Sequence, residues 1–442
     1  MKNFTIILIC LFTTTTLFGQ QEKGIIGTTN WLHNWTEFNP KTIDYGEPTQ
    51  ILAGNITEDT KLLKRNIYLL SGSVFVTNNA TLTIEPGTVI IGDYDSKASL
   101  TIAKGSAIIA DGLETDPIIF TSNRSVKRAG DWGGVIILGD APTNKFGSGS
   151  VTSYYTRPNA TTYTNSNYGG DDPASNSGIL RHVRIEYAGK RIKDVGYFNG
   201  LLLASVGFET ILENIMVTHC AGNSFEIIGG VINLNKAVSH KSSSNDFKFN
   251  YGAQCNFTNS LAIRSPYVSN STTSARCIQI NSYENKEEVD FSKNGTSVIA
   301  ENITLLTNSN DISSDIRKGL VKAAIFVGHN TSLDMNRSVI SGFNPAVLLE
   351  NKISVNQENL EKIRFTDMYF HNCNGNIFVE NNSNNEDLEN WYGNSVFFNV
   401  YSKGANSETF IDIKNQKRPD YRLRINKIIA SNEVDSDIRR ID

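Results

Sequence analysis

The chain has 442 residues, of which 19% are charged, and its formal net charge at pH 7 is −4. This near balance of charge provides no general attraction to nucleic acid or to an anionic membrane, so nucleic acid is not expected as a partner. The 10 prolines and 4 methionines are few beside abundant asparagine, threonine, serine and glycine. That composition is typical of many short strands joined by polar turns.

The first residues have the pattern of a secretory signal peptide. Lys2 precedes an apolar run from Phe4 to Phe12, and the small residue Gly19 closes the segment. Residues 1–19 are therefore predicted to direct export to the periplasm, the outer membrane or the medium. No later stretch reaches the ~18 apolar residues of a membrane helix. Residues 20–66 contain no repeat and are predicted to form an N-terminal leader that caps the open end of a repeat fold.

One pattern occurs twice near the start of the mature chain. Leu82 is matched eighteen residues later by Leu100, and the turn glycine Gly87 by Gly105. Each copy reads as two short strands around a turn, and so small a unit buries its apolar face only by stacking on a neighbour. The repeat predicts an all-β solenoid, a parallel β-helix over residues 67–400, in which Leu82 lies directly above Leu100.

Two segments depart from the repeat. Residues 141–177 form a long polar insertion, and long loops on a rigid scaffold often carry binding residues. Residues 401–442 contain the last strand signals and a charged tail. The mature chain also has four cysteines without metal-ligand spacing, which are predicted to be buried free thiols: Cys220, Cys255, Cys277 and Cys373.

After residue 177 the coils follow a second pattern, in which a polar residue precedes a short strand and another polar residue follows five positions on. The first polar residue is often asparagine, for which stacking along the solenoid is a structural explanation. The second set forms a row: Tyr187, His219, His240, Arg264, Thr307, Ser341 and Asn372. Its first four members are the candidate ligand-binding residues, because cations within ~10 Å on neighbouring coils attract an anionic ligand. The alternative is that they are solvated turn residues.

The insertion contains the candidate metal ligands. Asp171 and Asp172 follow Tyr168 and two glycines. Two adjacent carboxylates in a glycine-rich loop suit Ca²⁺, and an ordinary acidic turn is the alternative. No other cofactor is predicted.

Several motifs in one order point to a known family. They are Leu82-Thr-Ile-Glu-Pro-Gly-Thr-Val-Ile90, Gly130-Asp-Trp-Gly-Gly134, Tyr168-Gly-Gly-Asp-Asp172, Arg181-His-Val-Arg-Ile-Glu-Tyr-Ala-Gly189 and Ser224-Phe-Glu226. Over roughly residues 80–252 the chain resembles secreted β-helix proteins of the Bacteroidota cell envelope, which are often mislabelled as multidrug transporters. The resemblance implies a right-handed parallel β-helix without a well-defined enzymatic activity, beside outer-membrane uptake systems. The chain departs from that family at residues 242–250, where the usual acidic run is reduced to Asp246.

Two classes of function remain open. The first is an exported, non-catalytic binding or structural protein that presents a ladder surface to a glycan or to an outer-membrane transport or envelope protein. The second is a polysaccharide lyase or glycoside hydrolase of the pectate-lyase-like type, which needs carboxylates and a base on adjacent coils. Glu186 and Glu226 are the nearest candidate carboxylates, but no pair of acids recurs at one coil position. The first class is therefore favoured, and no catalytic residue is assigned.

Overall fold

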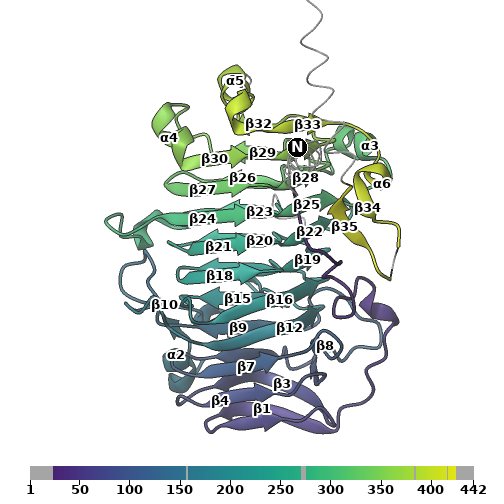
Figure 1. Cartoon of the computed structure of the whole chain (residues 1–442). Helices are drawn as coiled ribbons and strands as arrows, with labels where there is room; N and C mark the ends of the chain where they lie inside the picture. Colours follow the sequence, from purple (N-terminus) through teal and green to yellow (C-terminus); the bar gives the residue numbers. More distant parts are fainter. Residues whose placement is uncertain (1–22, 156–157, 270–274, 383–384, 416, 425–442) are drawn as a thin grey trace, which may run out of the picture.

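The protein is a right-handed parallel β-helix (Figure 1). The computed structural model describes residues 23–155, 158–269, 275–382, 385–415 and 417–424. The predicted signal peptide and the charged end of the tail lie outside these residues. One 29-stranded sheet winds around a single axis, which confirms the predicted fold class.

Each regular coil contributes one strand to each of three parallel ladders. The first ladder contains β1 (Gln50–Ile56), β3 (Ile67–Val76), β5 (Val89–Gly92), β8 (Ile118–Ser122), β12 (Gly178–Glu186), β16 (Ile211–Thr218), β19 (Val238–His240), β22 (Leu261–Arg264), β25 (Thr304–Thr307), β28 (Val339–Ser341), β31 (Tyr369–His371) and β33 (Val400–Ser402). The second contains the ends of β1 and β3, then β6 (Ser99–Ile102), β9 (Val135–Leu138), β15 (Leu201–Ala204), β17 (Phe225–Ile228), β20 (Phe247–Asn250), β23 (Ile278–Ile280), β26 (Ile325–Val327), β29 (Val347–Leu349) and β32 (Ile377–Val379). The third contains β2 (Thr60–Leu62), β4 (Thr81–Ile84), β7 (Ala107–Asp111), the starts of β12 and β16, β18 (Val231–Asn235), β21 (Gln254–Thr258), β24 (Thr296–Glu301), β27 (Thr331–Asn336) and β30 (Ile363–Thr366).

The eighteen-residue repeat is not one coil. Leu82 pairs with Ile108 in the third ladder, whereas Leu100 pairs with Val74 and Val135 in the second. The prediction that Leu82 and Leu100 stack is therefore wrong. The repeat describes a strand, a turn and a strand, and this pattern recurs at different corners of a coil that has three strands.

The interior of the solenoid is apolar and continuous. Alternate side chains of every strand point inward, and Ile102, for example, has no exposed surface. Glycine is required where coils approach closely, because a Cβ on Gly134 would lie 2.0 Å from the carbonyl oxygen of Asn199. Three of the four cysteines are fully buried in this interior, and all four described cysteines are free thiols.

The leader covers the outer face of the first ladder. Lys23 forms an ion pair of 2.7 Å with Asp367 near one end of the solenoid, and the backbone oxygen of Trp35 accepts from Arg184 at 3.5 Å, several coils away. In Figure 1 this dark purple segment descends along one side of the ladders. The hairpin of β34 (Phe410–Asp412) and β35 (Asp420–Leu423) packs on the same face. The leader thus covers a side of the solenoid, whereas the pattern predicted a cap over the open end.

The insertion at 141–177 covers the first part of the second ladder. It contains β10 (Gly149–Ser150), η2 (Thr152–Tyr154), α2 (Ala160–Asn165) and β11 (Asn167–Tyr168). Tyr155 packs on Phe75 with ring centroids 4.9 Å apart, and the surrounding cluster includes outward residues of β9 and β15. Its cover continues to β17, where Ile228 packs against the same cluster, and the start of the insertion reaches further, because Asn144 donates to the Ser282 carbonyl at 3.0 Å and Lys145 pairs with Glu288 at 2.6 Å.

The remaining elements are short excursions from the coils. They are η1 (Pro40–Thr42), β13 (Arg191–Ile192), β14 (Gly196–Tyr197), η3 (Lys286–Glu288), α3 (Ile312–Arg317), α4 (Gln357–Lys362), α5 (Glu386–Tyr392), η4 (Ser395–Phe397) and α6 (Asn406–Thr409). Two of them, η3 and α4, follow strands of the open part of the second ladder and border the site described next.

Candidate functional site

The structure brings three of the four predicted ligand-binding residues together. The rings of Tyr187 and His219 have centroids 5.4 Å apart, and those of His219 and His240 are 5.5 Å apart. The hydroxyl of Thr218 lies 2.9 Å from Nδ1 of His219 and 3.0 Å from Nδ1 of His240. These residues form a stack at the edge of the first ladder.

This stack is a packed contact under the leader. His240 is 4% exposed, and Phe38 of the leader meets its ring edge-on at 5.2 Å. Burial lowers the pKa of His219 to about 4 and holds that of His240 well below its ordinary value. Both imidazoles are therefore neutral at pH 7, and the stack lacks the positive charge expected of it.

Arg264 does not join the stack. The residue in register with His240 is Ile263, and the Arg264 guanidinium forms an ion pair of 2.8 Å with the buried Asp246. His240 was counted from Asn235, but the bend with left-handed backbone falls one residue later, at Lys236. The row member of that coil is therefore Lys241, and His240 lies one position before it. The prediction of three converging cations is corrected to a histidine pair and a separate buried ion pair.

The remaining predicted site residues are Glu186, Asp171 and Asp172. Glu186 is buried, pairs with Arg184 at 3.3 Å and accepts a hydrogen bond from Tyr45 of the leader at 3.0 Å. Asp171 and Asp172 are exposed, and Asp172 accepts the backbone N–H of Ala174 at 3.0 Å. Within the residues that the structure describes, no group of three or more His, Cys, Asp or Glu side chains is placed to hold a metal ion. A Ca²⁺ ion at Asp171 would therefore have at most two carboxylate ligands.

A groove follows the open part of the second ladder and its corner with the third ladder. Three hollows of about 530, 290 and 490 Å³ adjoin there. The first two share Gln279 and Glu284, and the last two share Gly328, His329 and Lys352. We call this continuous depression the ladder groove.

The floor of the ladder groove is a row of outward side chains in register. Glu226 pairs with Lys248, Lys248 with Gln279, and Gln279 with Phe326. Neighbouring strands lie ~4.8 Å apart, so four successive coils give the row a length of roughly 14 Å. The row begins beside the insertion, whose Tyr154 lines the first hollow together with Glu226.

The charges in the first hollow are paired. Nζ of Lys248 lies 3.0 Å from Oε1 of Glu226 and also contacts Glu284. Asn199 donates to the other oxygen of Glu226 at 2.6 Å. Burial acts to lower the pKa of Lys248, but the two carboxylates outweigh it and raise that pKa above its ordinary value. Lys248 is therefore a charged, fully paired group at neutral pH.

The second hollow contains a hydroxyl, an imidazole and a carboxylate in sequence. Tyr283 is hydrogen-bonded to Nε2 of His329. Nδ1 of His329 lies 2.5 Å from Oε2 of Glu350, and the same carboxylate oxygen accepts the backbone N–H of His329 at 2.8 Å. Lys352 contacts the other oxygen of Glu350 at 3.0 Å. We call Tyr283, His329 and Glu350 the tyrosine relay.

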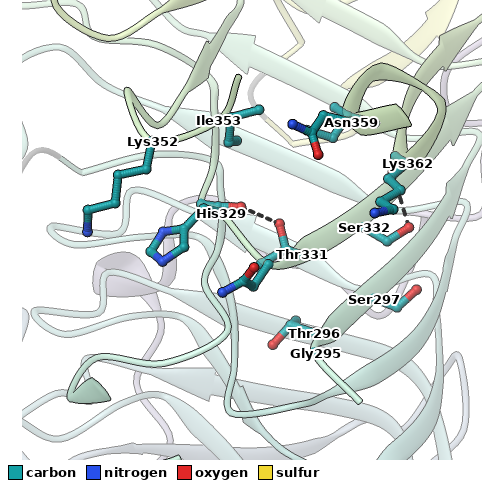
Figure 2. A pocket seen from close by; sticks show the side chains of 13 residues that line it. Gly295, Thr296, Ser297, His329, Thr331, Ser332, Lys352, Ile353, Asn359 and Lys362 are labelled. Atoms are coloured by element: carbon teal, nitrogen blue, oxygen red, sulfur yellow. Dashed lines mark hydrogen bonds between the residues drawn. The ribbon is translucent and has the colours of Figure 1, made fainter. Parts of the chain in front are cut away.

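The third hollow lies at the corner between the second and third ladders. Figure 2 shows His329 and Lys352 on one side of it and Asn359 and Lys362 on the other. The hydroxyl of Thr331 closes the intervening turn by donating to the Gly328 carbonyl at 2.6 Å. Lys362 has its own partner in α4, because it contacts Glu358 at 2.9 Å.

The sequence contained one usable signal for this groove. Glu226, Lys248 and Gln279 each stand between apolar neighbours in their strands, which is the alternation of a half-buried strand. Glu226 was a candidate carboxylate, and the other two residues were missed. Tyr283 and His329 are 46 residues apart and carry no motif, so only the folded coils bring them together.

The family of the protein is established by comparison. The chain matches the pectate-lyase-like β-helix domain family over residues 54–410, and it belongs to that family. A search of curated proteins and a search of solved structures each found no match. Among the described residues, the helices are all too short or too polar to cross a membrane.

Proposed function

We propose that this protein is an exported glycan-binding protein of the cell envelope and that the ladder groove holds an extended glycan chain. The observation that carries the proposal is the continuity of the groove over successive coils. A solenoid repeats one kind of surface position at a fixed spacing, and such extended surfaces suit polymeric ligands. Binding of this kind requires no bond-breaking chemistry.

The groups in the ladder groove match the chemistry of sugars. Amide side chains at Gln279 and Asn281, which both line the second hollow, can donate to and accept from sugar hydroxyls. Tyr197 and Phe326 add flat apolar faces along the same groove. A concave site with apolar surface and a few placed polar groups is the usual form of a ligand site.

The pairing of charges favours a neutral glycan. The lysines that line the three hollows are Lys248, Lys352 and Lys362, and each contacts a carboxylate. An acidic sugar would have to compete with those carboxylates for a cation. A neutral chain is accommodated without breaking an ion pair.

The proposed location rests on the sequence. Residues 1–19 have the charge and apolar pattern of a signal peptide, and the motifs resemble envelope proteins of Bacteroidota. An outer-membrane uptake protein is the partner that this resemblance suggests. We therefore place glycan capture in the periplasm, at the outer membrane or outside the cell.

A glycan array followed by titration calorimetry tests the proposal. The wild-type protein is expected to bind a neutral polysaccharide such as a mannan, a xylan or a β-glucan. The blocking variant is Gln279→Trp, because Gln279 lies in the floor where the first two hollows meet. Its larger side chain should abolish binding by filling the groove.

The matched control is Ile299→Trp. Ile299 is an outward residue of β24 on the third ladder and is 51% exposed, so the substitution adds the same side chain at a position that lines none of the three hollows. Full affinity in Ile299→Trp and loss of affinity in Gln279→Trp support the proposal. Equal affinity in both variants, or no glycan binding by the wild type, contradicts it.

A further inference from the structure

The protonation of the tyrosine relay follows from its contacts. The Glu350 oxygen that accepts the His329 backbone N–H also lies 2.5 Å from Nδ1. A carboxylate is only an acceptor, so Nδ1 carries the proton and Nε2 carries the lone pair. The Tyr283 hydroxyl must then be the donor to Nε2. This order of hydroxyl, imidazole and carboxylate is that of a nucleophile activated by a base.

The carboxylate of the relay is held in its ionised form. Burial acts to raise the pKa of Glu350, but hydrogen bonds from His329 and Lys352 outweigh burial and lower that pKa below its ordinary value. Ionised Glu350 stabilises an imidazolium when His329 takes a proton. For the same reason it is a poor proton donor, and a glycosidase needs a protonated carboxylic acid beside the scissile bond.

All three members of the relay line the second hollow, where we place the glycan. Tyr283 lines the second hollow with Gln279, Asn281 and Phe326. The Tyr283 ring packs edge-on against Phe291 at 5.6 Å, which fixes the ring while the hydroxyl contacts His329. The amides of Gln279 and Asn281 are the kind of donor that stabilises a developing oxyanion.

We propose that the tyrosine relay removes ester-linked acyl groups from a neutral glycan, with Tyr283 as the nucleophile. This inference rests on the proposed glycan groove and adds an activity to it. Acyl transfer fits better than elimination from a uronate, because elimination needs a cation for the uronate carboxylate. The lysines of the first and second hollows are Lys248 and Lys352, and both already contact carboxylates.

The reaction balances with water as the second substrate. The Tyr283 oxygen attacks the acyl carbon while its proton passes to Nε2 of His329, and the bond from the acyl carbon to the sugar oxygen breaks. The sugar oxygen leaves with the proton from His329, and the acyl group remains on Tyr283. Water then gives a proton to His329 and attacks the acyl carbon. The Tyr283 oxygen leaves, takes the proton back and releases the carboxylic acid.

The test uses two probes, 4-nitrophenyl acetate and acetylated xylan, with the full-length mature protein. The wild type is expected to release acetate from both, and Tyr283→Phe and His329→Gln should each be slower by on the order of 100-fold or more. Mass spectrometry of the quenched reaction should find the acetyl group on the peptide that contains Tyr283. The control Tyr267→Phe, at an exposed tyrosine outside the groove, should react as the wild type does.

The possible outcomes distinguish failure of the tyrosine relay from failure of the ladder groove. Xylan that binds with unchanged affinity to wild type and Tyr283→Phe, without acetate release by the wild type, overturns the relay and leaves the glycan groove standing. Acetate release from 4-nitrophenyl acetate without affinity for any glycan supports the relay and contradicts the groove. Equal rates in wild type and Tyr283→Phe, with equal unfolding temperatures, also overturn the relay.

Discussion

His329 and Glu350 lie on successive coils of the second ladder, with 2.5 Å between Nδ1 and Oε2. Each residue follows its strand by one or two positions, His329 after β26 and Glu350 after β29. The register of β26 with β29 therefore sets the distance between them. Regular coil geometry, and not a sequence motif, creates this contact.

The first prediction concerns the tautomer of His329. Nitrogen NMR at neutral pH should find the proton on Nδ1 and none on Nε2, because Nδ1 is the ring nitrogen that contacts Glu350. Glu350→Gln removes the charge but keeps the shape, and it should give a mixture of tautomers. A protonated Nε2 in the wild type would contradict the direction of the relay.

The second prediction concerns the core. Ile102 in β6 has no exposed surface, so Ile102→Asp places an unpaired charge in a dry interior and should lower the free energy of unfolding by on the order of 4 kcal/mol. The control is Ile51→Asp, since Ile51 in β1 is 73% exposed. Urea denaturation measures both variants. Similar losses at the two positions would argue against the buried placement of Ile102.

The third prediction concerns the buried ion pair. Asp246 is completely buried, and Arg264 contacts it at 2.8 Å. Arg264→Ala leaves that carboxylate without its cation and should lower the free energy of unfolding by about 3–5 kcal/mol. Adding Asp246→Asn removes the stranded charge and should restore part of the loss. A single Arg264→Ala variant as stable as wild type would mean that the guanidinium points to solvent.

The fourth prediction concerns the histidine stack. In the unfolded chain His219 and His240 titrate near 6.5, whereas burial lowers the folded-state pKa of His219 to about 4 and that of His240 in the same direction. Between pH 6.5 and 4 the unfolded chain binds protons that the folded chain does not. The free energy of unfolding should therefore fall as pH drops through this window, by at most about 1.4 kcal/mol per unit for each histidine.

Urea titrations at several pH values measure this slope. The double variant His219→Gln, His240→Gln should have a flatter profile below pH 6.5 than the wild type and an unchanged profile above it. A parallel profile in the double variant would show that these histidines are protonated in the folded protein.

The sequence predicted the solenoid because each strand has its own apolar alternation. It misplaced the repeat because the pattern at Leu82 and Leu100 serves two different corners of the coil. It misplaced His240 because the bend before β19 falls at Lys236, a residue that gives no sign of a left-handed backbone. Asparagine marks such bends at Asn259 and Asn302, where its tolerance of that conformation is a usable signal.

The groove was harder to predict than the fold. Its floor at Lys248 and Gln279 follows from strand alternation once the second ladder is recognised. The tyrosine relay depends on loops of different length after β23, β26 and β29, and loop length is not periodic. The packing of the leader on the first ladder was equally hard to predict from the sequence. The leader contacts residues that are hundreds of positions away, as Lys23 and Asp367 show.

The central claim is that a glycan lies along the second ladder, and hydroxyl-radical footprinting of the complex tests it most directly. With the polysaccharide selected on the array, side-chain oxidation should decrease at Tyr197, Tyr283 and Phe326, which line the ladder groove. Oxidation at the exposed Tyr267 should stay the same. Protection confined to residues outside the groove, such as Ile299 of the third ladder, would contradict the account.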